Sequence, residues 1–136
     1  MSTNLNFQLI TPDKVLVSEI VDMVMVPGIE GYFGVLPNHM DMISTLRPGL
    51  IKIFKDSFEI PIRSFFVEKG FAEVDREGCV LLVEKAYPFE DLTPDYIKEC
   101  LDETVEKINS SNDIKEKEIL NVRLEAFNEM QRLCVS

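Results

Sequence analysis

The sequence predicts two successive parts, an all-β sandwich over residues 1–90 and an α-helical antiparallel hairpin over residues 91–136. The first observation behind this prediction is the distribution of glycine and proline along the chain. Every glycine lies at or before Gly78 and no proline follows Pro94, so turn-forming residues divide only the first two-thirds of the chain. The second is periodicity, since short alternating apolar runs typical of strands give way to the three-to-four-residue spacing typical of helices.

Short apolar segments separated by turn signals predict the strands of the first part. Turns are indicated at Arg47-Pro48-Gly49 and Arg76-Glu77-Gly78, and strands at such close spacing are typical of a sandwich or barrel. Pro61 restricts its segment to a sheet edge or a bulge, because proline donates no hydrogen bond. The expected strands are Leu5–Ile10, Val15–Val17, Ile20–Val26, Asp41–Leu46, Leu50–Lys55, Phe58–Arg63, Phe65–Lys69, Ala72–Val74 and Cys79–Glu84.

Two helices are expected in the second part. Thr93 offers a hydroxyl cap, and Pro94 suits the first helical position, where its missing N–H costs nothing. Ser110-Ser111-Asn112 interrupts this helix, and Asp113 with Glu116 resembles a capping box that opens a second one. Because the break is short, the helices are expected to pack antiparallel. Their apolar stripes are Ile97, Leu101, Thr104/Val105 and Ile108, then Leu120, Phe127, Met130 and Cys134.

Composition excludes several classes of function. Apolar residues make up 46% of the 136, enough to bury a core, and the formal net charge is -10. This charge argues against nucleic acid and against anionic lipid, because both need concentrated Lys and Arg. Three distant cysteines without a CxxC pair favour a reducing compartment over a disulfide framework or a zinc site. No signal peptide or long apolar run is visible, so no direct membrane insertion is expected.

The sequence contains few residues in patterns typical of a catalytic site. His39 is the single histidine, and no serine lies in a nucleophile-elbow pattern, so neither a triad nor a histidine-based metal site is expected. The run Gly28–Gly34 has the spacing GxxGxxG, which is not that of a dinucleotide or phosphate loop. It is interpreted as turns, with Tyr32 and Phe33 near a loop tip where aromatic residues favour a protein contact.

The same loop resembles a known family signature. Val26-Pro27-Gly28-Ile29-Glu30-Gly31-Tyr32-Phe33-Gly34-Val35-Leu36-Pro37-Asn38-His39 is similar to the EGxxGxxPxH-like run of the epsilon subunits of bacterial F-type ATP synthases. Leu46-Arg47-Pro48-Gly49 resembles the family's L-x-P-G turn. Phe66–Val74 resembles its strand–GG–strand segment, with Lys69 replacing one glycine, and Ala86 falls where the family's last strand ends. The resemblance extends over the whole chain.

This resemblance implies a non-catalytic central-stalk subunit at the cytoplasmic face of a bacterial plasma membrane. It implies docking on the gamma subunit and the c-ring, and contact with alpha and beta subunits when the hairpin extends to inhibit ATP hydrolysis. The hairpin then alternates between two packings. The partner contacts that it implies are Glu30, Gly31, Tyr32, Phe33, His39, Met40 and Met42.

Departures from the family pattern change two expectations. Thr93 and Tyr96 stand where ATP-sensing members carry Asp and Arg, so no cofactor is expected. The segment 93–136 has six basic and ten acidic residues, a net charge of 6 − 10 = −4, which weakens attraction to an acidic partner segment. Inhibition is therefore expected to be weak, with Arg123 and Arg132 as its regulatory contacts. The position after Gly31, often acidic in the family, is Tyr32.

Two other classes of function compete with this interpretation. A small ligand-binding β-domain with a nucleotide-responsive helical lid would need polar ligand groups at the hairpin, where the charged pair is missing. A free-standing enzyme of the compact β-barrel type would need convergent titratable groups, and the sequence offers His39 and scattered carboxylates.

Overall fold

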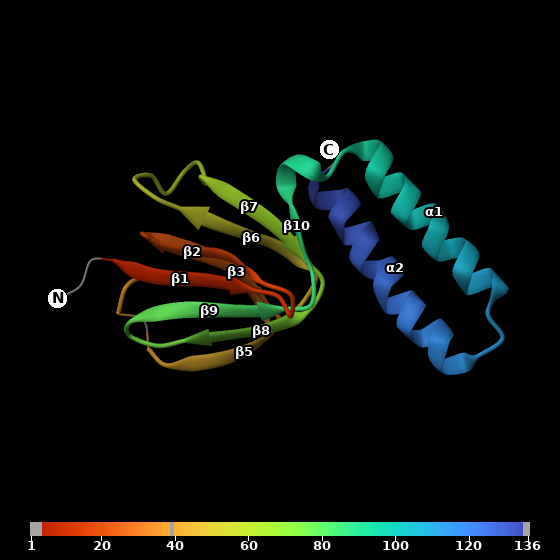
Figure 1. Ribbon diagram of the computed structural model, residues 1–136, viewed down its shortest axis with the longest axis horizontal. Helices are drawn as coiled ribbons and strands as arrows, with labels where there is room; N and C mark the ends of the chain where they lie inside the picture. The colour runs from red at the N-terminus through yellow and green to blue at the C-terminus, as the bar shows by residue number, and fades with distance from the viewer. Residues whose placement is uncertain (1–3, 39, 135–136) are drawn as a thin grey trace. The chain divides into compact units, whose positions relative to one another are not determined.

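The computed structural model describes residues 4–38 and 40–134, which form two compact units divided between Pro88 and Phe89 (Figure 1). The first unit is built of strands and the second of helices. The predicted fold class, a β-sandwich followed by a helical hairpin, is confirmed. In the part of the chain described, no helix has the length and apolar character needed to cross a membrane.

Ten strands form one hydrogen-bonded network in the order β10-β7-β6-β3-β5-β8-β9-β1-β2, with β4 attached to β3. All pairs are antiparallel except β1 with β9, which is parallel. The strands are β1 (Leu5–Ile10), β2 (Val15–Val21), β3 (Met23–Gly28), β4 (Gly31–Val35), β5 (Met42–Leu46), β6 (Gly49–Phe54), β7 (Arg63–Val67), β8 (Gly70–Val74), β9 (Gly78–Val83) and β10 (Ala86–Pro88).

Alternating side chains from β1 to β9 enter a single core. Along β1, for example, Leu5, Phe7 and Leu9 are fully buried, because every second residue of a strand faces the same side. A network of this length can enclose one core only by folding over on itself. The sandwich therefore has an inner face defined by these residues and outer faces on which partners can act.

Two expected strands differ from the structure, and one segment expected as turns is a strand. Ile20–Val26 is not one strand, because the chain turns at Asp22, whose N–H donates to the Phe54 carbonyl at 2.9 Å and whose carboxylate accepts from the Asp56 N–H at 2.7 Å. Phe58–Arg63 is an open loop up to the start of β7, and Asp56 adopts a φ of 66° as the chain enters it. Conversely, Gly31–Val35 is a strand, where the sequence indicated turns.

The second unit contains a short 3-10 turn (Phe89–Asp91), α1 (Pro94–Ser110) and α2 (Ile114–Cys134). Thr93 caps α1 as expected, since its hydroxyl accepts from the Tyr96 N–H at 3.2 Å. Asp113 caps α2 by accepting from the Lys115 N–H at 2.9 Å. The reciprocal half of the expected capping box is replaced, because the Asp113 N–H donates to the Ser111 hydroxyl.

The apolar stripes of the two helices are largely those expected from the spacing. Ile97 of α1 and Phe127 and Met130 of α2 are buried, whereas Ile119 is exposed. The side chain of Cys134, expected on the second stripe, lies outside the described residues.

Candidate partner-docking surfaces

The predicted contact loop is the tight turn of the β3–β4 hairpin. Gly28 pairs with Gly31, which leaves Ile29 and Glu30 at the tip, and Gly31 adopts a φ of 137° that favours glycine. The Ile29 N–H donates to the Thr45 carbonyl at 2.9 Å. The turn is therefore held against β5, with the Ile29 and Glu30 side chains exposed.

Tyr32 is fixed in place by its surroundings. Its hydroxyl accepts a hydrogen bond from the Leu50 N–H at 3.0 Å, and the Arg47 guanidinium lies 5.8 Å from the centre of its ring. The ring passes so close to Gly49 that a β-carbon there would lie 2.5 Å from the hydroxyl oxygen. With 40% of Tyr32 still exposed, its side chain is a rigid part of the surface that a partner can contact.

Phe33 faces the other way from Tyr32, because successive residues of a strand alternate. It packs against the core, and its ring lies 2.8 Å from where a β-carbon of Gly28 would be. The two aromatics were expected near a loop tip; they follow the tip of the β3–β4 turn directly, but as residues of β4, and Phe33 also supports the fold.

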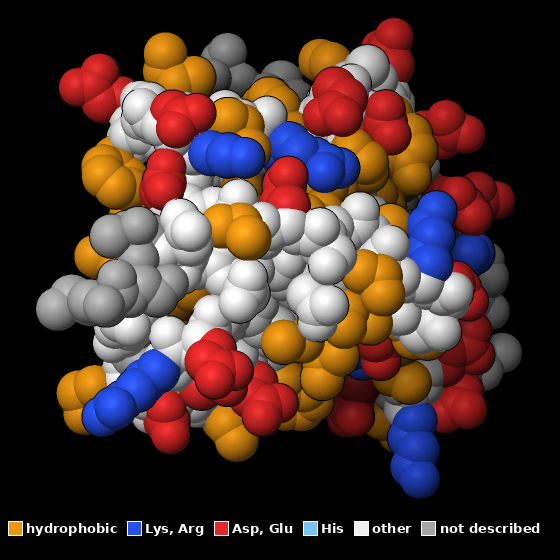
Figure 2. Space-filling model, turned by 60° about the vertical axis from the view of Figure 1, so that its left-hand side comes forward, with side chains coloured by type: hydrophobic (Ala, Val, Ile, Leu, Met, Phe, Trp, Pro, Cys, Tyr) orange, Lys and Arg blue, Asp and Glu red, His pale blue; other side chains and the backbone are white. Residues whose placement is uncertain are grey.

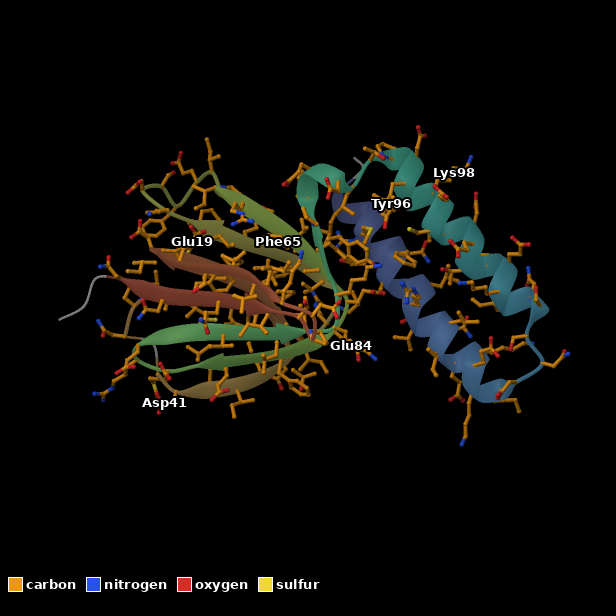
Figure 3. All side chains as sticks on the ribbon, viewed as in Figure 1. Glu19, Asp41, Phe65, Glu84, Tyr96 and Lys98 are labelled. Carbon is orange, nitrogen blue, oxygen red and sulfur yellow. The ribbon has the colours of Figure 1, made fainter. Side chains whose placement is uncertain are left out.

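The remaining predicted contacts are divided between two places. Met42 packs partly on the core, and together with the turn residues it lines an open groove along β4 and β5. Met40 is 82% exposed and comes after the C-terminal end of β4. Gly31 lies at the other end of this strand, which is about 13 Å long. Asp41, labelled in Figure 3, marks that end of the sheet. His39 lies outside the described residues, so its predicted role stays a prediction.

A second candidate surface, which the sequence analysis missed, lies on the outer face of the sheet. Val15, Ile10, Leu82 and Phe71 are consecutive cross-strand neighbours on β2, β1, β9 and β8, and we call them the apolar row. Val15, Leu82 and Phe71 are 52%, 43% and 56% exposed, and a groove runs beside Ile10, Leu82 and Phe71. The inner face of these strands is also apolar, so the sheet is hydrophobic on both sides here.

A local signal for this surface does exist in the sequence. The run Val80-Leu81-Leu82-Val83 is apolar without interruption, which is typical of a strand covered on both faces rather than one. The next row on the same face is mixed, with Gln8 donating to the Ser18 hydroxyl at 3.5 Å and with Glu73 beside Val80. The apolar row therefore has a polar, acidic margin.

Acidic side chains are spread widely over the molecular face shown in Figure 2, with hydrophobic ones between them. No cluster of Lys and Arg gathers at either candidate surface among the described residues. Among the described residues, these surfaces therefore present apolar side chains and hydrogen-bond acceptors.

The two arginines expected to act in inhibition are already engaged within α2. The Arg123 guanidinium lies 5.2 Å from the centre of the Phe127 ring, and the Arg132 Nε donates to the Glu129 carboxylate at 3.1 Å. At the start of α1, burial and the neighbouring Cys100 thiol raise the pKa of Tyr96, so this side chain stays a neutral phenol. The Thr93 hydroxyl is occupied as the helix cap.

Groups able to perform chemistry do not converge in the described part of the chain. No set of three His, Cys, Asp or Glu side chains there is arranged to hold a metal ion. Burial and the nearby Asp75 carboxylate raise the pKa of the Cys79 thiol to about 12, which keeps it protonated and non-nucleophilic at neutral pH.

Residues 4–89 match the family of the ATP synthase Delta/Epsilon chain, beta-sandwich domain. The chain belongs to this family. An ATP synthase epsilon chain from Maricaulis maris is 34% identical over 96% of both chains, and one from Rhodospirillum centenum is 49% identical over 63% of this chain and 59% of its own. The prediction of an epsilon subunit of an F-type ATP synthase is confirmed.

Solved structures share the fold of the epsilon chain. A chain of the mitochondrial ATP synthase of Euglena gracilis superposes with a TM-score of 0.79 at 21% identity, over 98% of this chain and 82% of its own. A chain of the Tetrahymena thermophila mitochondrial ATP synthase central stalk and c-ring gives 0.69 at 15% identity, over 96% of each. At such identities the likeness extends to architecture, including the two C-terminal helices.

Proposed function

We propose that this epsilon chain is a non-catalytic rotor subunit that couples the gamma subunit to the c-ring in the central stalk of a bacterial F-type ATP synthase. It works at the cytoplasmic face of the plasma membrane, as a peripheral protein. The apolar row is the observation that carries the proposal, because apolar side chains exposed together on the outer face of a sheet mark a surface that a partner protein covers.

The apolar row is assigned to the gamma subunit. Phe71 and Leu82 stand on regularly paired strands, and a register shift between Leu9 and Ile10 brings Val15 to the same face. They present an ordered apolar surface that suits a folded protein partner. The acidic margin at Glu73 surrounds it as a polar rim. A rotor contact must transmit torque without slipping, and a rigid interlocking patch serves this better than a flexible loop.

The β3–β4 turn and the segment at the far end of β4 are assigned to the polar loops of the c-ring. Glu30 offers a carboxylate at an exposed tip, and Gly31, Tyr32 and Met42 line the groove beside it. Met40, exposed beyond the other end of β4, forms a second contact. Phe33 contributes by holding the turn, because its ring packs under Gly28.

A tagged full-length chain isolated from the membranes of its own bacterium is expected to co-purify with the alpha, beta, gamma and c subunits. Each of these subunits is expected in a constant ratio to the tagged chain. The composition can be measured by quantitative mass spectrometry of the detergent-solubilised complex. A chain purified without gamma, or bound to a small molecule instead, would contradict the rotor assignment and favour the ligand-binding β-domain with a helical lid.

The hairpin is proposed to be a weak brake on ATP hydrolysis. Its net charge of −4 opposes docking on an acidic segment of a catalytic subunit, and its Arg123 and Arg132 must first leave Phe127 and Glu129. Each exposed contact of this kind contributes roughly 0.2–1 kcal/mol, so exchanging one for another changes the balance little.

Deleting residues 93–136 is therefore expected to raise ATP hydrolysis by the purified complex less than about fivefold, since exchanging the available charge contacts changes the balance by under about 1 kcal/mol. Steady-state hydrolysis by complexes with the full and shortened chains measures this, with gamma content as the control for assembly. A rise of an order of magnitude or more would show that apolar contacts make the hairpin a strong brake.

ATP binding by the isolated subunit is expected to be weaker than micromolar. Thr93 is occupied as a helix cap, Tyr96 is a neutral phenol, and a triphosphate meets a chain of net charge -10. Calorimetric titration with Mg-ATP tests this. The informative control is the double variant Thr93→Asp with Tyr96→Arg, which restores the charged pair of ATP-sensing members. Tight binding by the unchanged chain would overturn the assignment.

A further inference from the structure

β2 forms one end of the strand network, paired with β1 on one side. No strand of the described chain pairs with its other side, so the backbone N–H and C=O groups there have no strand partner. At seven residues, VLVSEIV, it is a long strand rich in Val and Ile. An edge of this kind is a template for pairing with another chain unless something prevents it.

Glu19 is a charged residue on the inward face of this edge strand. It pairs across the sheet with Phe7, which is fully buried, and it lies between Val17 and Val21, which are 3% and 1% exposed. Residues two apart on a strand share a face, so the Glu19 side chain points toward the core and not toward the apolar row (Figure 3). Its Oε1 is buried and accepts no hydrogen bond from any residue that the structure describes.

This arrangement is unfavourable for the fold taken alone. Val17, Glu19 and Val21 would form an unbroken apolar stripe if position 19 held a β-branched residue. A carboxylate oxygen without a partner weakens the folded state relative to such a residue, because it has lost water and gained no hydrogen bond. Neither the gamma surface nor the c-ring surface uses this side chain, so its presence needs another explanation.

We propose that Glu19 guards the open edge of β2 against pairing with β2 of a second copy of this chain. Antiparallel pairing of the two edges would extend the sheet across both molecules and close the remaining access of water to both carboxylates. Two inward carboxylates would then lie within the same short stretch of ladder, where burial and mutual repulsion both oppose the pairing. The free subunit therefore stays a monomer until it meets its stalk partners.

Glu19→Ile separates this role from a purely structural one. The variant is expected to unfold at a higher urea concentration than the parent, and yet to form dimers as its concentration rises, while the parent sediments as a monomer throughout. Hydrogen exchange measured in the dimer should show protection of the β2 amides that point away from β1. A variant that remains monomeric across the same concentrations, with these amides unprotected, overturns the proposal.

Ser18→Ile is the matched control, because it adds the same side chain to the outer face of the same strand and keeps Glu19. It is expected to leave the β2 amides unprotected. Equal protection in both variants would show that apolar surface, and not the inward charge, decides the association. If Glu19→Ile does not fold, Glu19→Gln provides the same test, since it removes the charge at nearly constant volume. A Glu19→Gln variant that remains monomeric at all concentrations also overturns the proposal.

Discussion

Phe71→Asp is expected to lower the affinity of the chain for the gamma subunit at least about a hundredfold and to leave its fold intact. Phe71 lies on β8, 56% exposed, beside Leu82 in the apolar row. An aspartate there loses the apolar contact and buries an unpaired charge in the interface, which together cost about 3 kcal/mol or more. Titration of labelled chain into the complex of alpha, beta and gamma subunits measures the loss.

Phe58→Asp provides the matched control for this experiment. Phe58 is 61% exposed, in the loop between β6 and β7, and it is not part of the apolar row. The substitution changes charge and apolar area by the same amounts, so general effects on solubility are shared. Its affinity for gamma is expected to stay within about threefold of the parent. Equal losses in both variants, or none in Phe71→Asp, would exclude the apolar row as the gamma surface.

Gly70→Ala is expected to destabilise the sandwich by about 3 kcal/mol or more. A β-carbon at Gly70 would lie 2.2 Å from the Leu82 carbonyl oxygen and 2.9 Å from the Val83 Cα, and Gly70 has a φ of 159°. The obstructing atoms belong to the backbone of β9, which its pairing with β8 and β1 holds in place. Urea unfolding followed by circular dichroism gives the difference in free energy.

Gly34→Ala tests whether this effect is specific to the close approach at Gly70. The added β-carbon at Gly34 would meet its nearest neighbour, the Met23 sulfur, at an ordinary contact distance of 3.5 Å. A change of less than about 1 kcal/mol in either direction is expected. Similar losses at both glycines would mean that the cost arises from the general removal of a glycine from a strand.

The same geometry explains a departure from the family's glycine pair. Lys69 replaces the first glycine, and its side chain is exposed and lies 3.5 Å from the Glu84 carboxylate. Only Gly70 touches the neighbouring backbone, so only the second glycine is required. The family pattern has glycine at both positions, and the difference between them depends on the contact of Gly70 with β9, which lies further along the chain.

Local chemistry was enough to predict the helical half and the class of the β half. Helix caps and helical periodicity act over a few residues, so Thr93 and the break at Ser110-Ser111-Asn112 could be identified from the sequence. The loop signature also identified the family, because its residues are contiguous. Strand boundaries were harder to predict from the sequence. A segment such as Gly31–Val35 becomes a strand because β3 pairs with it, whereas its glycines by themselves indicate a turn.

The proposed docking surface and the proposed role of Glu19 depend on tertiary structure alone. Ile10 and Leu82 are far apart in sequence and become neighbours only through the parallel pairing of β1 with β9. Glu19 is an ordinary carboxylate in the sequence, and only the register of β2 on Phe7 turns it inward. A shift of one residue would reverse every side chain of the strand, and register is set by the whole sheet. Sequence thus determined the two helices and the class of the β half, and strand pairing determined which side chains each face presents.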